Sequence, residues 1–136
     1  NLLKIKKVVP KPMSYINNCD LYQLLKKYTN NIWLSDGAFQ LIDTQNLKDF
    51  LALDNTNKKI YVTESFDCDD FSYLLMGRIT DWNSDNTFGI VWGMSAGGYA
   101  HAWNFFIDEN KTVKFVEPQT DTIFEPTTEQ IWIMIV

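Results

Sequence analysis

Cysteine and histidine are scarce in this chain, which limits the centres that can be built from them. Its 136 residues include two cysteines and one histidine. Two cysteines are too few for a disulfide scaffold, although Cys19 and Cys68 could pair with each other. One histidine and two cysteines cannot complete a four-ligand structural zinc site without carboxylates. Cys19 lies in a polar stretch, where we expect an ordinary thiol.

Positive charge and long apolar runs are also lacking. The 12 basic residues are outnumbered by 17 acidic ones, and the net charge of −5 argues against a nucleic-acid partner. No apolar run approaches the roughly 20 residues that span a bilayer, so we expect no membrane partner. The start of the chain lacks a signal peptide's apolar core and cleavage site, which favours a cytoplasmic or phage-associated protein. The missing initiator Met indicates a processed product or a fragment.

The apolar content is sufficient for one domain. Hydrophobic residues make up 46% of the chain, and its length suggests a single domain over residues 1–136. Residues 1–12 contain two prolines and are predicted to form an extended arm. Helical spacing of leucines predicts a helix over residues 20–28, with Asp20 as its N-cap, and a second helix capped by Thr44.

The stretch between these helices has the pattern of a hairpin. Asp36-Gly37 is typical of a tight turn, and it would join a strand over residues 32–34 to another over residues 38–42.

The pattern of the second half changes from helix to strand. A helix is predicted to begin at Cys68, because Phe71, Leu74 and Leu75 share one helical face. Apolar and alternating segments beyond it predict strands over residues 88–94, 99–107, 112–116, 123–124 and 131–136. Helices followed by an antiparallel sheet make an α+β fold.

Three residues in chain order carry the functional interpretation. Asp67 is a good N-cap, which places Cys68 in the first helical turn, where free N–H groups favour a thiolate. His101 follows on a predicted strand, 101 − 68 = 33 residues later, and Glu117 on the next strand, 117 − 101 = 16 residues further on. A hairpin of that length sets Glu117 beside His101. A nucleophile, its base and an orienting carboxylate are the parts of a thiol hydrolase.

Three carboxylates crowd this cysteine. Asp67, Asp69 and Asp70 favour the helix start but raise the pKa of a neighbouring thiol. Either a protonated His101 or a cation would offset them, and hard oxygen ligands favour calcium. The alternative is a solvated acidic first turn.

Three further residues are candidates for the same site. Gln119 would share a strand face with Glu117 and could donate to an oxyanion, ligate a metal or simply face the hairpin. Tyr61 precedes Cys68 and could supply an oxyanion donor. Trp103 is placed two residues after His101, where it would line the core or a cleft.

The motifs as a group resemble a known family. Asp-Cys-Asp-Asp-Phe at 67–71, His-Ala-Trp-Asn at 101–104 and Glu-Pro-Gln at 117–119 are similar to the papain-like domain of the Marasmius oreades agglutinin, with similar small domains in bacteria and phages. The resemblance covers roughly residues 30–125. It implies a papain-like fold, a Cys68–His101–Glu117 triad and proteolysis dependent on calcium, with Asp69, Asp70 and Gln119 near the metal. No organic cofactor is implied, nor is carbohydrate binding, because the chain has no room for a sugar-binding trefoil.

The sequence therefore predicts a cysteine peptidase acting on a protein or peptide substrate. Two alternatives remain open. One is a thiol amidase or transferase that acts on cell-wall peptide or glutamine. The other is a non-enzymatic phage or host-binding module with a papain-like fold. Substrate identity and oligomeric state are left open.

Overall fold

The computed structural model describes residues 7–136. Within this range the helices are α1 (Asn18–Leu25), α2 (Thr44–Leu53) and α3 (Cys68–Trp82), with a short 3₁₀ helix at Thr56–Lys58. The strands of the same range are β1 (Tyr15–Asn17), β2 (Ile32–Trp33), β3 (Ala38–Gln40), β4 (Gly89–Met94), β5 (Ala100–Ile107), β6 (Val113–Glu117), β7 (Thr122–Phe124) and β8 (Gln130–Ile135).

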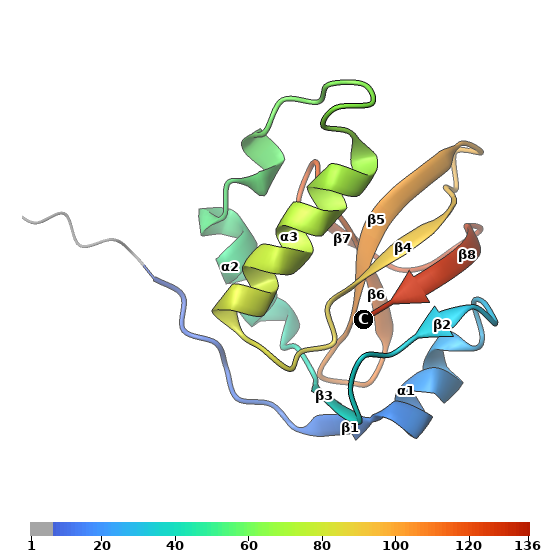
Figure 1. Cartoon of the computed structure of the whole chain (residues 1–136). Helices are drawn as coiled ribbons and strands as arrows, with labels where there is room; N and C mark the ends of the chain where they lie inside the picture. The colour runs from blue at the N-terminus through green and yellow to red at the C-terminus, as the bar shows by residue number, and fades with distance from the viewer. Residues whose placement is uncertain (1–6) are drawn as a thin grey trace, which may run out of the picture.

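A six-stranded sheet forms the body of the fold, in the order β2-β8-β4-β5-β6-β7 (Figure 1). Its pairs are antiparallel except β2 with β8, which run parallel. In Figure 1, α2 and α3 stand together on one side of this sheet, and α1 lies apart from them near β2. The fold is α+β as expected, and the strands predicted in the second half are confirmed.

The predicted hairpin around Asp36-Gly37 is wrong. The strand after the turn, β3, pairs with β1, and the strand before it, β2, pairs with β8. Neither Asp36 nor Gly37 has the positive φ that a type I′ turn needs. The segment therefore carries the chain from one sheet to the other.

Two predicted caps are displaced by one or more residues. Helix α1 begins at Asn18, because the side chain of Asn17 accepts the N–H of Asp20 at 2.8 Å. Helix α2 is capped by Asp43 rather than Thr44, since its carboxylate accepts the N–H of Asn46 at 3.0 Å. In both cases an Asn or Asp that precedes the predicted cap accepts a free N–H group of the first helical turn.

The start of α3 is as predicted. Asp67 is the N-cap, and it forms a reciprocal capping box with Asp70, whose carboxylate accepts the Asp67 N–H at 3.1 Å. Cys68 is therefore the first residue of the helix.

The structure describes the predicted arm from residue 7 onwards. Residues 7–14 form no helix or strand, and residues 1–6 lie outside the described range. The arm is held by side chains of α2 and α3: the Trp82 indole donates to the Val8 carbonyl at 2.8 Å, and Asn46 donates to the Val9 carbonyl at 3.0 Å.

The core consists of two apolar clusters divided by the sheet. Successive side chains of a strand point to opposite faces, and β5 therefore contributes to both clusters. Trp103, Phe105 and Ile107 pack with α1 residues in one cluster, while Phe106 packs with α3 residues in the other. This alternation positions the functional residues of β5.

Candidate functional site

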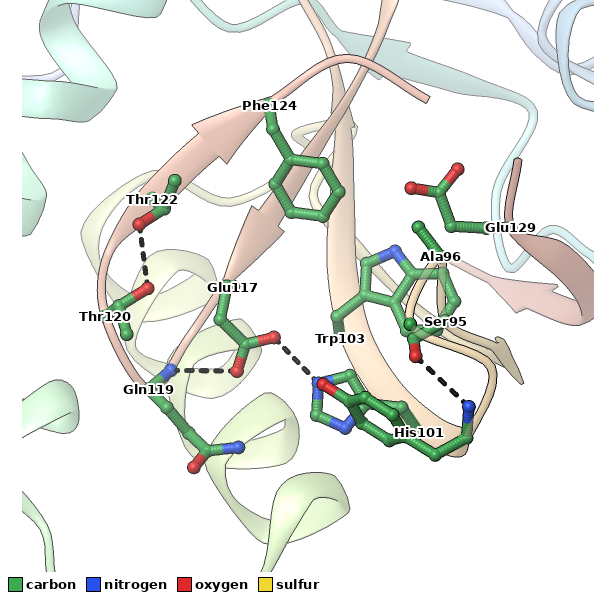
Figure 2. A pocket seen from close by; sticks show the side chains of 12 residues that line it. Ser95, Ala96, His101, Trp103, Glu117, Gln119, Thr120, Thr122, Phe124 and Glu129 are labelled. Atoms are coloured by element: carbon green, nitrogen blue, oxygen red, sulfur yellow. Dashed lines mark hydrogen bonds and ion pairs between the residues drawn. The ribbon is translucent and has the colours of Figure 1, made fainter. Parts of the chain in front are cut away.

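His101 and Glu117 lie together at the ends of two neighbouring strands. The distance between His101 Nε2 and Glu117 Oε2 is 2.8 Å, and both side chains are partly buried (Figure 2). The second carboxylate oxygen of Glu117 accepts the backbone N–H of Gln119 at 3.4 Å. The expected pairing of these two strand residues is confirmed.

Beside His101, strand β4 approaches β8 closely. Gly93 is the strand partner of His101, and the β4–β8 register shifts between Trp92 and Gly93. A Cβ on Gly93 would collide with the carbonyl of Gln130 on β8. A glycine is needed here because the two strands approach closely at the bulge.

Aromatic rings surround His101. Trp103 stacks against it with ring centroids 5.8 Å apart and an interplanar angle of 23°. The ring centroid of Tyr99 lies 5.6 Å from that of His101. Trp103 is 2% exposed and belongs to the core, as expected for a core or cleft-wall residue. Tyr99 is 59% exposed.

These residues line a pocket of about 490 Å³. Its lining residues are Ser95, Ala96, Gly97, Tyr99, His101, Trp103, Glu117, Gln119, Thr120, Thr122, Phe124 and Glu129. Sequence reasoning identified only the part of this set around His101 and Glu117. Tyr99 could have been predicted from the sequence, because side chains two residues apart share a strand face and Tyr99 precedes His101 and Trp103 at that spacing. The β4–β5 turn and Glu129 gave no such signal.

The indole nitrogen of Trp103 has no hydrogen-bond partner among the described residues, although it is buried. In Figure 2 it points into the space between Phe124 and Glu129. A buried N–H without a partner costs about 1–3 kcal/mol, so this donor is a conspicuous feature of the pocket.

Cys68 is the first residue of α3 and does not line this pocket. The backbone N–H of Ala102 is close enough to donate to its sulfur. Burial raises the pKa of the Cys68 thiol, and the charges of Asp67 and Asp69 raise it further. The thiolate expected from the helix start is therefore disfavoured, and Cys68 is absent from the residues that line the pocket. Cys68 and Cys19 are both free thiols.

The acidic cluster is the one candidate metal centre in residues 7–136. Oxygens of Asp67, Asp69 and Asp70 lie within 4.8 Å of one another. The ion pairs that Lys and Arg form in this range involve other carboxylates. Carboxylate oxygens are among the ligands that calcium takes, and a calcium ion needs further oxygens beyond these three residues. Gln119 lines the pocket together with Glu117, and its predicted role as a metal ligand stays a prediction.

Tyr61 lies in the loop before α3. Its ring stacks on Phe71 at 6.4 Å between centroids, and it is 50% exposed. The oxyanion roles predicted for Tyr61 and Gln119 stay predictions.

The family model described as "Agglutinin C-terminal" matches residues 39–123. This is more than half of the chain, which therefore belongs to the agglutinin C-terminal family. No curated protein matches the chain. No helix in residues 7–136 has the length and apolar character needed to cross a membrane.

Two solved structures share the fold. One, described as the PSL1a-E64 complex, has a TM-score of 0.78 and 22% identity, over 90% of this chain and 51% of its own. The other is the Polyporus squamosus lectin bound to the human-type influenza-binding epitope Neu5Aca2-6Galb1-4GlcNAc. It has a TM-score of 0.75 and 22% identity, over 90% of this chain and 49% of its own. The chain thus spans about half the length of these proteins.

These findings correct the predicted activity. The family is described by an agglutinin, and one of the two structures is that of a lectin, which points to binding rather than to peptide-bond hydrolysis. The prediction of a cysteine peptidase with a protein substrate is therefore wrong. Burial also raises the pKa of the Cys68 thiol, which acts against the thiolate that a nucleophile needs.

Proposed function

We propose that this chain is a non-enzymatic binding domain with a papain-like fold, and that it takes a glycan into the pocket beside His101. The observation that carries the proposal is the lining itself, which sets aromatic faces beside hydroxyl, amide and carboxylate groups. Ligand pockets combine apolar walls with a few placed polar groups in this way. The lectin match supports a sugar as the ligand.

The proposal assigns a role to each wall of the pocket. Tyr99 offers an exposed ring on which the apolar face of a sugar can lie. Oε2 of Glu117 lies 2.8 Å from Nε2 of His101, and this contact fixes the orientation of the carboxylate beside the pocket. Thr120 and Thr122 bond each other through their hydroxyls at 2.8 Å, which leaves one hydroxyl hydrogen of the pair for a ligand.

Calorimetric titration of the chain with neutral oligosaccharides tests this function. Tyr99→Ala should weaken binding about tenfold, since roughly 1.4 kcal/mol corresponds to that factor. Trp33→Ala is the matched control, because Trp33 is also an exposed aromatic residue, at 63%, and does not line the pocket. Equal loss in both variants, or no heat with any glycan, contradicts the proposal.

We further propose that Asp67, Asp69 and Asp70 hold calcium at the start of α3. The donor set supports this, because the capping box engages one oxygen of Asp70 and leaves the other free. A bound cation would offset three like charges at one helical turn and so stabilise the segment that packs against β5.

A further inference from the structure

We propose that the surface between α2 and the end of α3 is a groove that binds an extended, lysine-containing segment of a partner protein. The chain's own arm, residues 7–14, lies in this groove and shows how such a segment is held. The arm groove is lined by Asp43, Asn46, Asp49, Phe50, Leu53 and Trp82. None of these residues lines the pocket beside His101, so the inference does not depend on the proposed function.

The groove holds the arm through the arm's backbone. The side-chain amide of Asn46 donates to the Val9 carbonyl at 3.0 Å, and its oxygen accepts the Lys11 N–H at 2.8 Å. The indole of Trp82 donates to the Val8 carbonyl at 2.8 Å. These three bonds do not depend on the side chains of the bound segment, because every residue has a carbonyl and every residue except proline has an N–H. Other extended segments can therefore bind in the same way, as in recognition of peptides through main-chain hydrogen bonds.

The charge of the groove favours a basic segment. Lys11 Nζ lies 3.2 Å from Asp43 Oδ1, and Asp49 and Asp81 line hollows that adjoin the arm. Arg78, the basic residue that α3 contributes to these hollows, already pairs with an aspartate at 3.3 Å. A lysine in the bound segment therefore meets a complementary surface, and a carboxylate there would meet like charges.

The described part of the arm occupies this surface without being buried in it. None of residues 7–14 is buried, and Val9 is 78% exposed. Hollows of about 300, 540 and 630 Å³ adjoin the arm and share Lys7 in their lining. Leu53 and the paired rings of Phe50 and Trp82, 4.6 Å apart, provide apolar walls. A segment with few buried apolar contacts opens more readily than the core, so a partner can replace the arm and fill these hollows.

A peptide added to the full-length chain tests the groove. The Lys11→Pro variant opens it, because the substitution removes both the N–H that Asn46 accepts and the charge that pairs with Asp43. A labelled peptide with the sequence of residues 7–14 is then titrated by fluorescence polarisation. We expect saturable binding to this variant. Binding to the unaltered chain should be at least about tenfold weaker, since the tethered arm competes at a millimolar effective concentration.

Matched variants identify the contacts. Asn46→Ala, added to the open variant, should weaken peptide binding at least about tenfold, because two backbone bonds are lost. Gln23→Ala, at an exposed amide residue of α1, is the control and should leave binding unchanged. A peptide carrying Lys11→Glu should also bind about tenfold more weakly. No binding to the open variant at millimolar peptide, or equal binding with and without Asn46, overturns the inference.

A measurement on the unaltered chain does not depend on how the variants fold. Millimolar peptide should displace the arm and speed hydrogen exchange of the Lys11 N–H, while the amides of α3 keep their exchange rates. An unchanged rate at Lys11, or faster exchange throughout α3, would show that the arm is a fixed part of the fold and that the groove takes no partner.

Discussion

Strand β5 presents Ala102, Asn104 and Phe106 toward α3, and His101 and Trp103 toward the pocket. The face toward α3 is closed. Asn104 donates from its amide to the Ser72 carbonyl at 3.1 Å and to the Gly89 carbonyl at 3.0 Å, within a fully buried environment. The pocket face is open and keeps a donor unused. One strand therefore supports the fold on one side and a ligand site on the other.

The position of Cys68 explains why this difference matters for function. Cys68 is the first residue of α3 and partly buried, and burial and two aspartates raise the pKa of its thiol. His101 and Glu117 lie on the open face, where ligands can reach them. Cys68 does not line the pocket that His101 and Glu117 line, although the three residues follow one another in the order of a catalytic triad.

The largest expected effect on the free energy of unfolding comes from a substitution on the face of β5 toward α3. Asn104→Ala removes two buried hydrogen bonds that tie β5 to α3 and β4, and it should lower the free energy of unfolding by about 3 kcal/mol. Urea denaturation with an unchanged m-value measures the loss. His101→Ala on the open face is the control and should cost only about 1 kcal/mol. Similar losses in both variants would remove the distinction between the faces.

Calcium should act at the start of α3. If the acidic cluster binds calcium, a free concentration about thirty times the dissociation constant stabilises the fold by about 2 kcal/mol and raises the Tm. Asp69→Asn should abolish most of this shift. Asp20→Asn, in the first turn of α1, is the control and should leave it unchanged. A Tm that does not respond to millimolar calcium favours the solvated acidic turn.

The smallest expected effect concerns Asp121 in the turn between β6 and β7. Burial, with a smaller contribution from the charge of Asp54, raises the pKa of Asp121 to about 6. The fold therefore disfavours the ionised form. The destabilisation is complete above pH 6 and disappears as the pH falls toward the ordinary value of 3.8.

Asp121→Asn should remove this pH dependence. The variant should be more stable than the parent chain by about 1 kcal/mol at pH 7, after allowance for solvent screening, and equally stable near pH 4. Asn also suits the positive φ of 60° at this position. Thermal unfolding at several pH values measures the difference. A constant gap between the two proteins across this range would contradict the assigned cause.

Elements with a strong local pattern were predictable from the sequence. The start of α3 followed from the Asp67 cap, and the strands around His101 followed from alternation and a polar turn. The wrong hairpin shows the limit of local signals. Asp36-Gly37 is a good turn sequence, but the better partners of its flanking strands lie at Tyr15–Asn17 and in β8.

The sequence alone determined which residues begin α3, which share a face of β5, and that Glu117 can reach His101, because these depend on short-range spacing. Only the tertiary structure decided how buried the Cys68 thiol is and therefore in which direction its pKa moves. It also decided that Glu129 and the β4–β5 turn complete the pocket, and that the Trp103 donor is left unpaired within the described chain. Desolvation and strand pairing join residues that are distant in sequence, so no local motif can encode them.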